Sequence, residues 1–487
     1  MMKFIKNITI VSIVVLLAFS CDYVDYDPIE NHEIVADAYF KSATDYEAAV
    51  IGVYDPLQWM YLNILIGDIA SDNSFSGGES ATDVLGLQHI DDMVHTPNND
   101  NLTSIWQWLY EGVNRANYLE ENKDKLDFEN KEELYGEVYY LRAYYYFELV
   151  KFFGGVPLFT EFRLSAGDSG TLQRASANEV YAQIETDLLN AINALPHTQS
   201  QKGRATKTAA QALLGKVYLF QDKFSDAALV LENVIGQFTL VNNYGDQFLK
   251  NGENGSESVF EVQHTNTSNW FDWGFVPQGT EGNFGVIHNG PRAFAGPTYA
   301  SGWSFNIPSS DLFSSFEAGD SRRDASILDI EAFAASTGAS YSEGYKHTGY
   351  FNNKYIPRAG ESGGQTELNY LTNYRSIRYA DVLLMAAEAN VRGNINNAKA
   401  VDYLNEVRRR AFGDTNHDVN ESGSALTQLI WEERNFELSM EGHRFFDLVR
   451  TGQATAAIDG FVTGKHEVFP IPQQEIDISG LTQNAGY

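Results

Sequence analysis

The sequence has 487 residues, of which 43% are hydrophobic and 13% aromatic, and its formal net charge is −31. This content excludes a disordered chain and suffices for one large or two medium domains, while the negative charge disfavours binding to nucleic acid and to anionic lipid head groups. The single cysteine excludes a disulfide framework, so packing must stabilise the fold.

The chain begins with an export signal. Two lysines precede an apolar run over residues 8–19, which is too short to span a membrane as a helix. We interpret residues 1–20 as a signal peptide and Cys21 as a lipid-acceptor residue, although bacterial lipoproteins usually carry Leu where Ala18 stands. An ordinary cleaved signal with an incidental cysteine is the alternative. Residues 21–35 then form an acidic tether, whose first aspartates resemble surface-export signals of Gram-negative lipoproteins.

Helical periodicity dominates residues 36–240. A segment rich in Gly, Asn and Pro over residues 67–100 interrupts the pattern and predicts a loop. We expect helices from about Ala36 onward and then over residues 103–121, 129–153, 176–194 and 205–236. Trp106 and Trp108 fall within a strongly helical segment and are expected in the core.

One repeat signature lies in the last of these helices. Leu214-Gly215, Tyr218 and Ala227 have the spacing of a tetratricopeptide helix hairpin, in which small residues let two helices approach closely. Ala386 and Ala398 repeat only the small-residue spacing. All of these are expected to be packing positions.

Residues 241–375 lose helical periodicity and are rich in Gly, Asn, Ser and Trp, which predicts a large loop-rich insertion. Helices resume in residues 376–487, over 379–391, 396–411 and 426–449. The predicted fold class is therefore mainly α, a tetratricopeptide-like helical scaffold with an irregular insertion.

Charged residues recur at steps of three and four in the last predicted helix. They are Glu432, Glu433, Arg434, Glu437, Glu441 and Arg444, followed by Asp447 and Arg450. Paired carboxylates can hydrolyse glycosides, but alternating charge on one helix favours an ion-paired face. Motifs typical of metalloproteases, serine hydrolases, P-loops and dinucleotide binding are missing from the sequence.

Ordered sequence blocks resemble the SusD/RagB family of nutrient-binding outer-membrane lipoproteins. The blocks are Gly136-Glu137 with Leu141-Arg142-Ala143, Gly154-Gly155-Val156-Pro157, Gly203-Arg204-Ala205-Thr206, residues 377–384 with Ala387-Glu388-Ala389, Leu404-Asn405 with Arg408, the charged block at 432–450, Pro470-Ile471-Pro472 and Gln483-Asn484. The resemblance implies a lipid-anchored protein on the outer cell surface without catalytic activity. It also implies a partner, a SusC-like TonB-dependent transporter, to which captured oligosaccharide is delivered.

Aromatic residues of the insertion are the first candidates for sugar binding, because pyranose C–H faces stack on aromatic rings while hydroxyl groups need polar partners. The ring candidates are Trp270, Trp273, Trp303, Phe275 and Phe284. The polar candidates in the insertion are Asp272, Asn289 and Arg292, with Asn269 and His288 nearby. From the early loop, Asp72, Asn73 and Phe75 could line the same face, with Asp68 nearby. Core packing of each Trp and loop capping by each polar residue are the alternatives.

One segment carries a calcium-like spacing. Asp414, Asn416, Asp418 and Asn420 place oxygen atoms at alternate positions. The Gly and the acidic residue expected later in a calcium loop are replaced by Val419 and Ala425, so a polar turn without cofactor is favoured.

The acidic composition favours a neutral glycan, such as a β-glucan, α-glucan or fructan, over a uronate polymer. Three alternatives stay open. The protein could capture peptides or glycopeptides as other members of the resembled family do, it could be a tetratricopeptide scaffold that binds only proteins, or it could be a glycoside hydrolase.

Overall fold

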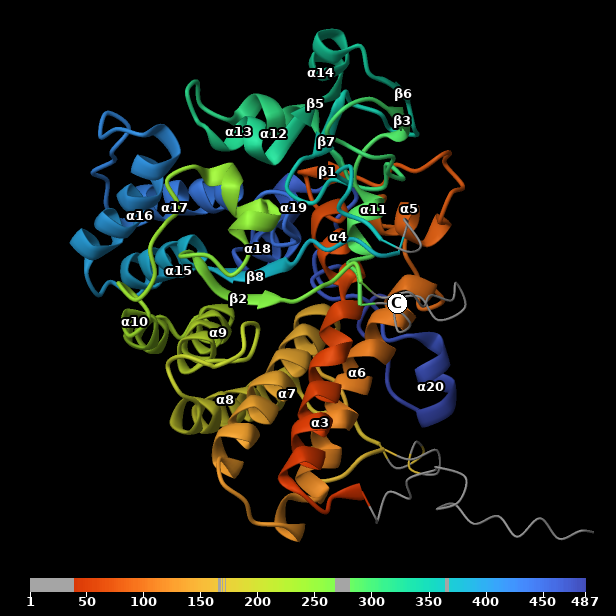
Figure 1. The fold of residues 1–487 in the computed structure, drawn as a ribbon, viewed down its shortest axis with the longest axis vertical. Helices are drawn as coiled ribbons and strands as arrows, with labels where there is room; N and C mark the ends of the chain where they lie inside the picture. Colours follow the sequence, from red (N-terminus) through yellow and green to blue (C-terminus); the bar gives the residue numbers. More distant parts are fainter. Residues whose placement is uncertain (1–38, 165–167, 169, 171, 268–280, 364–367) are drawn as a thin grey trace, which may run out of the picture.

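The computed structural model describes residues 39–164, 168, 170, 172–267, 281–363 and 368–487 (Figure 1). The predicted signal peptide, Cys21 and residues 268–280 lie outside this part of the chain. Among the described residues, no helix has the length and apolar character needed to cross a membrane.

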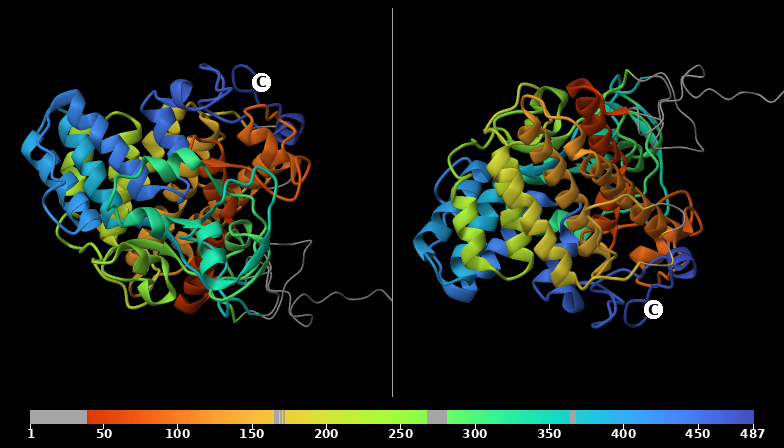
Figure 2. Two further views of the ribbon diagram at one scale, coloured as in Figure 1. Left: turned by 90° about the horizontal axis from the view of Figure 1, so that it is seen from above. Right: turned by 90° about the horizontal axis from the view of Figure 1, so that it is seen from below.

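A continuous array of helices forms the N-terminal half and confirms the predicted mainly helical class. Its members are α3 (Ala43–Tyr54), α6 (Asp100–Glu121), α7 (Lys131–Phe153), α8 (Ala177–Ala194), α9 (Lys207–Phe220) and α10 (Phe224–Glu232). From α6 to α10 each helix contacts the next, and α10 contacts a helix of the C-terminal half, so the array continues across the insertion (Figure 2).

Helix α7 lies at the centre of this array and is buried on nearly every side. Several of its tyrosine hydroxyls donate to backbone carbonyls, as when Tyr135 donates to Leu119 at 2.7 Å and Tyr145 donates to Val53 at 2.6 Å. A tyrosine can therefore fill the core without leaving a polar atom unsatisfied. Trp106 and Trp108 are buried against this core, as expected.

The hairpin of α9 and α10 shows why its small residues are required. A Cβ atom added to Gly215 would lie 2.3 Å from Leu231 Cδ2, so only glycine permits this approach. Ala227 and Ala386 are buried, as expected. Ala398 is exposed, so its predicted packing role is wrong.

Part of the predicted early loop is helical. Helix α4 (Tyr61–Ile69) extends into it, and α5 (Leu85–Asp91) lies inside it. Leu87 and Ile90 form the buried apolar side of α5. The helix was not predicted because it is too short to produce a strong periodic pattern in the sequence.

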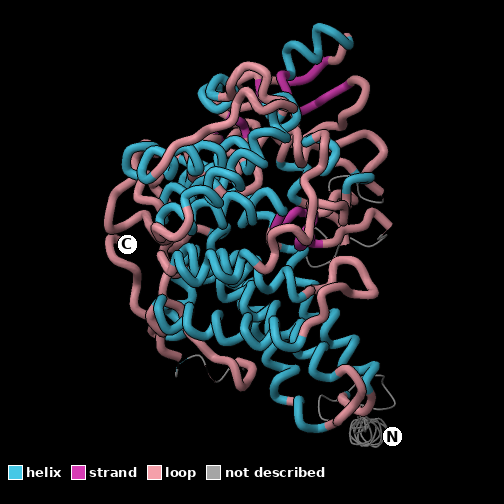
Figure 3. Tube along the Cα trace, turned by 90° about the vertical axis from the view of Figure 1, so that its left-hand side faces the viewer, coloured by secondary structure: helices cyan, strands magenta, loops and turns pink. Residues whose placement is uncertain are grey.

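The insertion consists of short strands, short helices and loops (Figure 3). Four two-stranded antiparallel sheets pair β1 (Ser74–Phe75) with β4 (Ile307–Pro308), β2 (Ser258–Val262) with β8 (Tyr374–Arg378), β3 (Arg292–Ala295) with β6 (Ser340–Ser342), and β5 (Ile327–Asp329) with β7 (Tyr350–Asn352). The helices are α11 (Gly285–His288), α12 (Ser310–Ser315), α13 (Arg322–Ser326) and α14 (Ile330–Thr337). The first sheet joins the early loop to the insertion.

The C-terminal helices are α15 (Tyr379–Arg392), α16 (Asn397–Phe412), α17 (Gly423–Leu438), α18 (Arg444–Arg450), α19 (Ala454–Ala457) and α20 (Gln473–Ser479). The single helix predicted over residues 426–449 is therefore wrong, because a turn separates α17 from α18. In this turn Met440 and Gly442 have φ angles of 64° and 82°. A Cβ atom on Gly442 would lie 2.7 Å from Ile64 Cα, so the turn packs closely on α4.

The expected ion-paired face of one helix is found only in part. Asp447 and Arg450 pair with each other at 2.7 Å, but four of the eight charges are buried and pair mainly with distant segments. Glu437 accepts hydrogen bonds from Arg378 at 2.8 Å and Arg322 at 3.2 Å, and Glu441 pairs with Lys354 at 2.7 Å. Burial alone would raise the pKa of Glu437, but Arg410, Arg378 and Arg322 outweigh it and hold this pKa below its ordinary value. We call Arg322, Arg378, Glu437 and Glu441, with their partners, the ion cluster.

We expect Arg378→Met to lower the free energy of unfolding by about 3–5 kcal/mol, because it leaves buried carboxylates without their counter-ion. Lys399→Met is the matched control, since Lys399 and Glu232 form a half-exposed pair at 2.6 Å and should contribute about 1 kcal/mol or less. Urea denaturation of both variants measures the difference. Equal losses in the two variants would contradict the central role of the ion cluster.

Candidate functional site

The chain on both sides of residues 268–280 is anchored at one place. The Thr265 amide donates to the Glu281 carbonyl at 2.9 Å, and the Asn283 amide donates to the Tyr370 carbonyl at 2.7 Å. Asn369 Nδ2 donates to the Asn266 carbonyl at 3.0 Å. The described residues that flank 268–280 therefore lie together beside the end of β2. Four of the predicted binding residues, Trp270, Asp272, Trp273 and Phe275, lie outside the described part of the chain.

An aromatic cluster lies directly behind this anchoring place. Tyr61 of α4 stacks on His288 of α11 with ring centroids 4.9 Å apart, and Phe284 meets the edge of Tyr61 at 4.8 Å. Trp303 packs edge-on against Phe284 at 5.6 Å and His288 at 5.3 Å. Phe284 is buried, whereas Trp303 and Tyr61 are only partly buried. Of the two described ring candidates, Trp303 is therefore the one that can offer ring surface to a ligand.

His288 is a neutral residue of this cluster. Burial lowers its pKa to about 4, and its Nδ1–H donates to the Phe284 carbonyl at 3.2 Å. With the ring fixed and uncharged, His288 acts as a flat packing surface between Tyr61 and Trp303.

Asn289 holds the fold together with all of its polar atoms. Its Nδ2 donates to the carbonyls of Gly285 at 3.1 Å and Tyr355 at 3.2 Å, and its Oδ1 accepts from Asn352 at 3.2 Å. This buried side chain positions α11 and is not placed to bind a ligand.

Arg292 lies at the surface beside Trp303. It donates to the Trp303 carbonyl at 2.7 Å, and its Nη2 lies 3.5 Å from Glu79 and 3.7 Å from Asp83. The early loop and the insertion therefore share one polar surface next to Trp303.

The three early-loop candidates are used mainly by the fold. Asp72 forms a two-pronged ion pair with Arg444, both contacts at 2.7 Å, and buried Asn73 donates to Asn435 at 2.7 Å. Phe75 is 38% exposed and lies near Lys346. Of these three, Phe75 keeps surface available for a ligand.

Asp68 is fully buried and links α4 to two other segments. It accepts from Asn306 Nδ2 at 2.9 Å and from the Gly442 amide at 2.8 Å. Burial raises its pKa to about 7, against the effect of these two donors. It is a structural residue below the surface.

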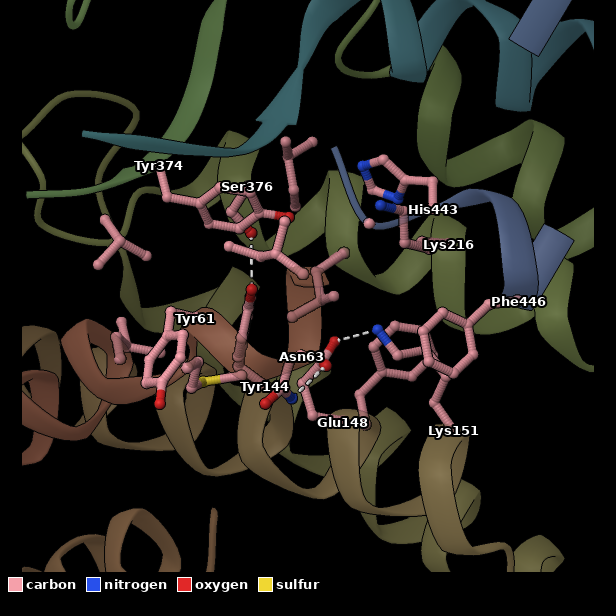
Figure 4. Close-up of a pocket in the computed structure, with 18 of the residues that line it drawn as sticks. Tyr61, Asn63, Tyr144, Glu148, Lys151, Lys216, Tyr374, Ser376, His443 and Phe446 are labelled. Carbon is pink, nitrogen blue, oxygen red and sulfur yellow. Dashed lines mark hydrogen bonds and ion pairs between the residues drawn. The ribbon is translucent and has the colours of Figure 1, made fainter. Parts of the chain in front are cut away.

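A polar cavity of about 60 Å³ lies between α4, α7, α9 and the turn before α18 (Figure 4). Lys151 pairs with Glu148 at 2.5 Å, Glu148 also accepts from Asn63 at 2.9 Å, and Tyr144 meets Ser376 at 2.8 Å. Ligand sites usually measure about 300–1,000 Å³, whereas a water needs only about 10–15 Å³. The cavity is therefore suited to a few waters that solvate buried charges and is too small for a sugar ring.

An open groove of about 590 Å³ lies next to the anchoring place, since Gln263 and Glu281 belong to its lining. It runs between the end of α3 with the following turn, the loop at residues 201–204, and β2. Within this lining, Gln58 Nε2 donates to the Gln263 carbonyl at 2.9 Å and contacts the Glu281 carboxylate at 3.3 Å. Sequence reasoning missed Tyr61, Gln58 and this groove, because lone polar residues in helices and turns carry no motif.

The side chains of the calcium-like segment at residues 414–420 bond to neighbouring groups of the protein. Asp414 accepts from the Asn416 amide at 2.8 Å and contacts His417 at 3.1 Å, and Asp418 pairs with Arg409 at 2.5 Å. The described part of the chain contains no group of three or more His, Cys, Asp or Glu side chains able to hold a metal ion.

Comparisons with known proteins identify relatives over nearly the whole chain. A family described as "Starch-binding associating with outer membrane" matches residues 24–219, and the SusD family matches residues 256–468. "SusD-like protein P2" of Formosa agariphila is 27% identical, over 99% of this chain and 100% of that protein.

Two solved structures share the fold. A laminarin binding SusD-like protein is 37% identical, covers 92% of this chain and 100% of its own, and superimposes with a TM-score of 0.84. Surface glycan-binding protein A from Bacteroides thetaiotaomicron, in complex with laminarihexaose, is 28% identical over 91% of this chain and 99% of its own, with a TM-score of 0.82.

His288 generates a pH-dependent prediction. Its folded pKa is about 4 and its ordinary value 6.5, so its contribution to stability is fully present above pH 6.5 and is lost as the pH falls towards 4. We expect His288→Phe, which keeps a ring beside Tyr61, to reduce the loss of unfolding free energy between pH 7 and pH 5 by about 2 kcal/mol. His197→Phe, at an exposed histidine, is the matched control. Parallel stability curves for wild type and His288→Phe would refute this assignment.

Proposed function

The chain belongs to the SusD/RagB family of non-catalytic surface glycan-binding proteins of the outer membrane, and we propose that its ligand is a laminarin-like β-glucan. The single observation that carries this ligand is the 37% identity, over 92% of the chain, to a laminarin binding SusD-like protein. The laminarihexaose complex of a second relative of the same fold supports the same glycan class.

We place the binding face where residues 268–280 join the fold. Trp270, Trp273 and Phe275 supply rings from this segment, and Trp303 supplies ring surface beside it. Glucan rings would stack on these side chains, while Asp272, Arg292 and Phe75 complete the surface. The described part supports this location because a rigid aromatic cluster lies under it, and rigid support lowers the entropic cost of binding.

The net charge of −31 supports a neutral ligand. A uronate polymer would have to approach a surface of its own sign, whereas a glucan carries no charge that the field could repel. Recognition would then depend on stacking and on hydrogen bonds to hydroxyl groups.

The biological role that follows is capture and delivery. Lipidation of Cys21 would hold the protein at the outer membrane, and the acidic tether at residues 21–35 would let the folded part reach a SusC-like TonB-dependent transporter. The transporter would then import the captured oligosaccharide.

We expect soluble protein without residues 1–21 to be retarded by laminarin in affinity electrophoresis, and the double variant Trp270→Ala/Trp273→Ala to lose this retardation, because each lost ring removes about 1 kcal/mol or more of stacking. Starch, levan, mannan, xylan and alginate serve as comparison glycans. Phe162→Ala is the control variant, since it removes an aromatic side chain that is 47% exposed elsewhere on the surface.

Retardation that persists in the double variant would place the site on another face. Retardation by alginate instead of laminarin would overturn the neutral-ligand proposal. Binding to none of the glycans would favour capture of peptides.

We expect Cys21→Ala to lose palmitate incorporation and to weaken membrane association, because the acyl groups attached at this thiol would supply the anchor. Radiolabelled palmitate incorporation and membrane fractionation measure both effects. Labelling that survives in Cys21→Ala would show that the lipid lies elsewhere.

A further inference from the structure

We propose that the open groove beside the binding face holds a second stretch of the same glucan chain, so that the protein grips a polysaccharide over a longer path than the aromatic face alone provides. The proposal rests on the glycan-binding function proposed above. The groove measures about 590 Å³, within the usual range of about 300–1,000 Å³ for ligand sites.

One wall of the groove is apolar and open to solvent. Ala48, Ile51 and Gly52 line it from helix α3, and Ile51 is 56% exposed. An exposed Ile beside a small residue leaves a shallow apolar shelf. Such a shelf suits the C–H face of a pyranose, which needs contact area but no polar partner.

Other lining residues of the groove are polar. Gln201 and Lys202 lie exposed on the loop at residues 201–204, and Gln58 and Glu281 also line the groove. Amide, ammonium and carboxylate groups together offer both donors and acceptors, which is the combination that sugar hydroxyls require. The groove therefore combines apolar surface with polar groups, which suits the two kinds of surface of a glucan chain.

The groove reaches the place where we propose the binding face. Its lining includes Glu281, the residue that follows 268–280 in the sequence, and the Glu281 carboxylate contacts Gln58 at 3.3 Å. Gln58 also lies beside Tyr61, whose ring supports Trp303 through His288. A glucan that leaves the aromatic face on this side would meet the groove next.

The charges of the groove fit a neutral occupant better than an anionic one. Arg204 is the largest cation of the lining, but it is neutralised by Glu137 at 2.8 Å and by Glu47. Asp55 pairs with Arg115 at 2.6 Å. The remaining exposed charges, Lys202 and Glu281, are of opposite sign.

Gly52 provides a clean test because a Cβ atom added there meets no atom within 4 Å. Gly52→Trp should therefore fill the groove without disturbing α3. Ala182→Trp, on an exposed position of α8, is the matched control. Ile51→Asn is a second variant, which removes the apolar shelf without adding bulk.

The measurement is isothermal titration calorimetry of each variant with laminaritriose and with polymeric laminarin. We expect Gly52→Trp and Ile51→Asn to bind laminarin on the order of tenfold more weakly than wild type and to bind laminaritriose with unchanged affinity. Ala182→Trp should match wild type with both ligands.

Unchanged laminarin affinity in Gly52→Trp would overturn the groove proposal and leave the proposed function intact. Equal weakening with the triose and the polymer would place the effect at the main site and also overturn it. Wild-type protein that bound neither ligand would overturn both the groove proposal and the proposed function. The experiment therefore distinguishes failure of the groove proposal alone from failure of the proposed function.

Discussion

The structure depends on the ion cluster around Arg378. This arginine donates to Glu257, Glu437 and Glu441, all of them buried, at 2.8–2.9 Å. Removing charges from water costs several kcal/mol each, and their attraction offsets this cost only when every charge has its partner in place. Glu257 precedes Arg378 by 121 residues, so the cluster forms only when the insertion and the C-terminal helices are assembled.

The ion cluster is also linked to the helix that carries Tyr61, beside the proposed binding face. Glu441 belongs to the turn after α17, and the next residue, Gly442, donates its amide to Asp68 of α4 at 2.8 Å. The close approach of Gly442 to Ile64 fixes α4 against this turn. Because α4 begins with Tyr61, the aromatic cluster under the binding face is connected to the ion cluster by one short helix.

The sequence predicted the long helices well, because their apolar periodicity extends over many turns and α7 is apolar on almost every side. It failed where tertiary contacts override local pattern. Glu437 and Glu441 have the spacing of an exposed ion-paired face, yet Arg378 and Lys354 arrive from the insertion and bury them. The break before α18 arises from the packing of Gly442 on α4, and the sequence contains no local signal for that contact.

The structure distinguishes candidate binding residues that are bonded within the protein from those that keep surface available for a ligand. Polar residues in loops can either contact a ligand or cap the loop, and the sequence does not distinguish the two roles. The structure shows that Asn289, Asp72 and Asn73 are bonded within the protein. Their respective partners are Asn352, Arg444 and Asn435. Trp303 differs because part of its ring stays uncovered. Residue type could therefore identify the chemistry of the face, but not which side chains remain available for it.

The buried arginines have a consequence for the surface. Arg322, Arg375 and Arg378 are among the largest fully buried side chains, and their positive charges neutralise carboxylates inside the protein. Because these buried cations are paired with buried carboxylates, the interior is close to neutral and the net charge of −31 falls mainly on the surface. On such a surface, ion pairing with an anionic ligand is disfavoured, and stacking and hydroxyl hydrogen bonds are the interactions left for recognition. This negative surface is consistent with the proposal that the ligand carries no charge.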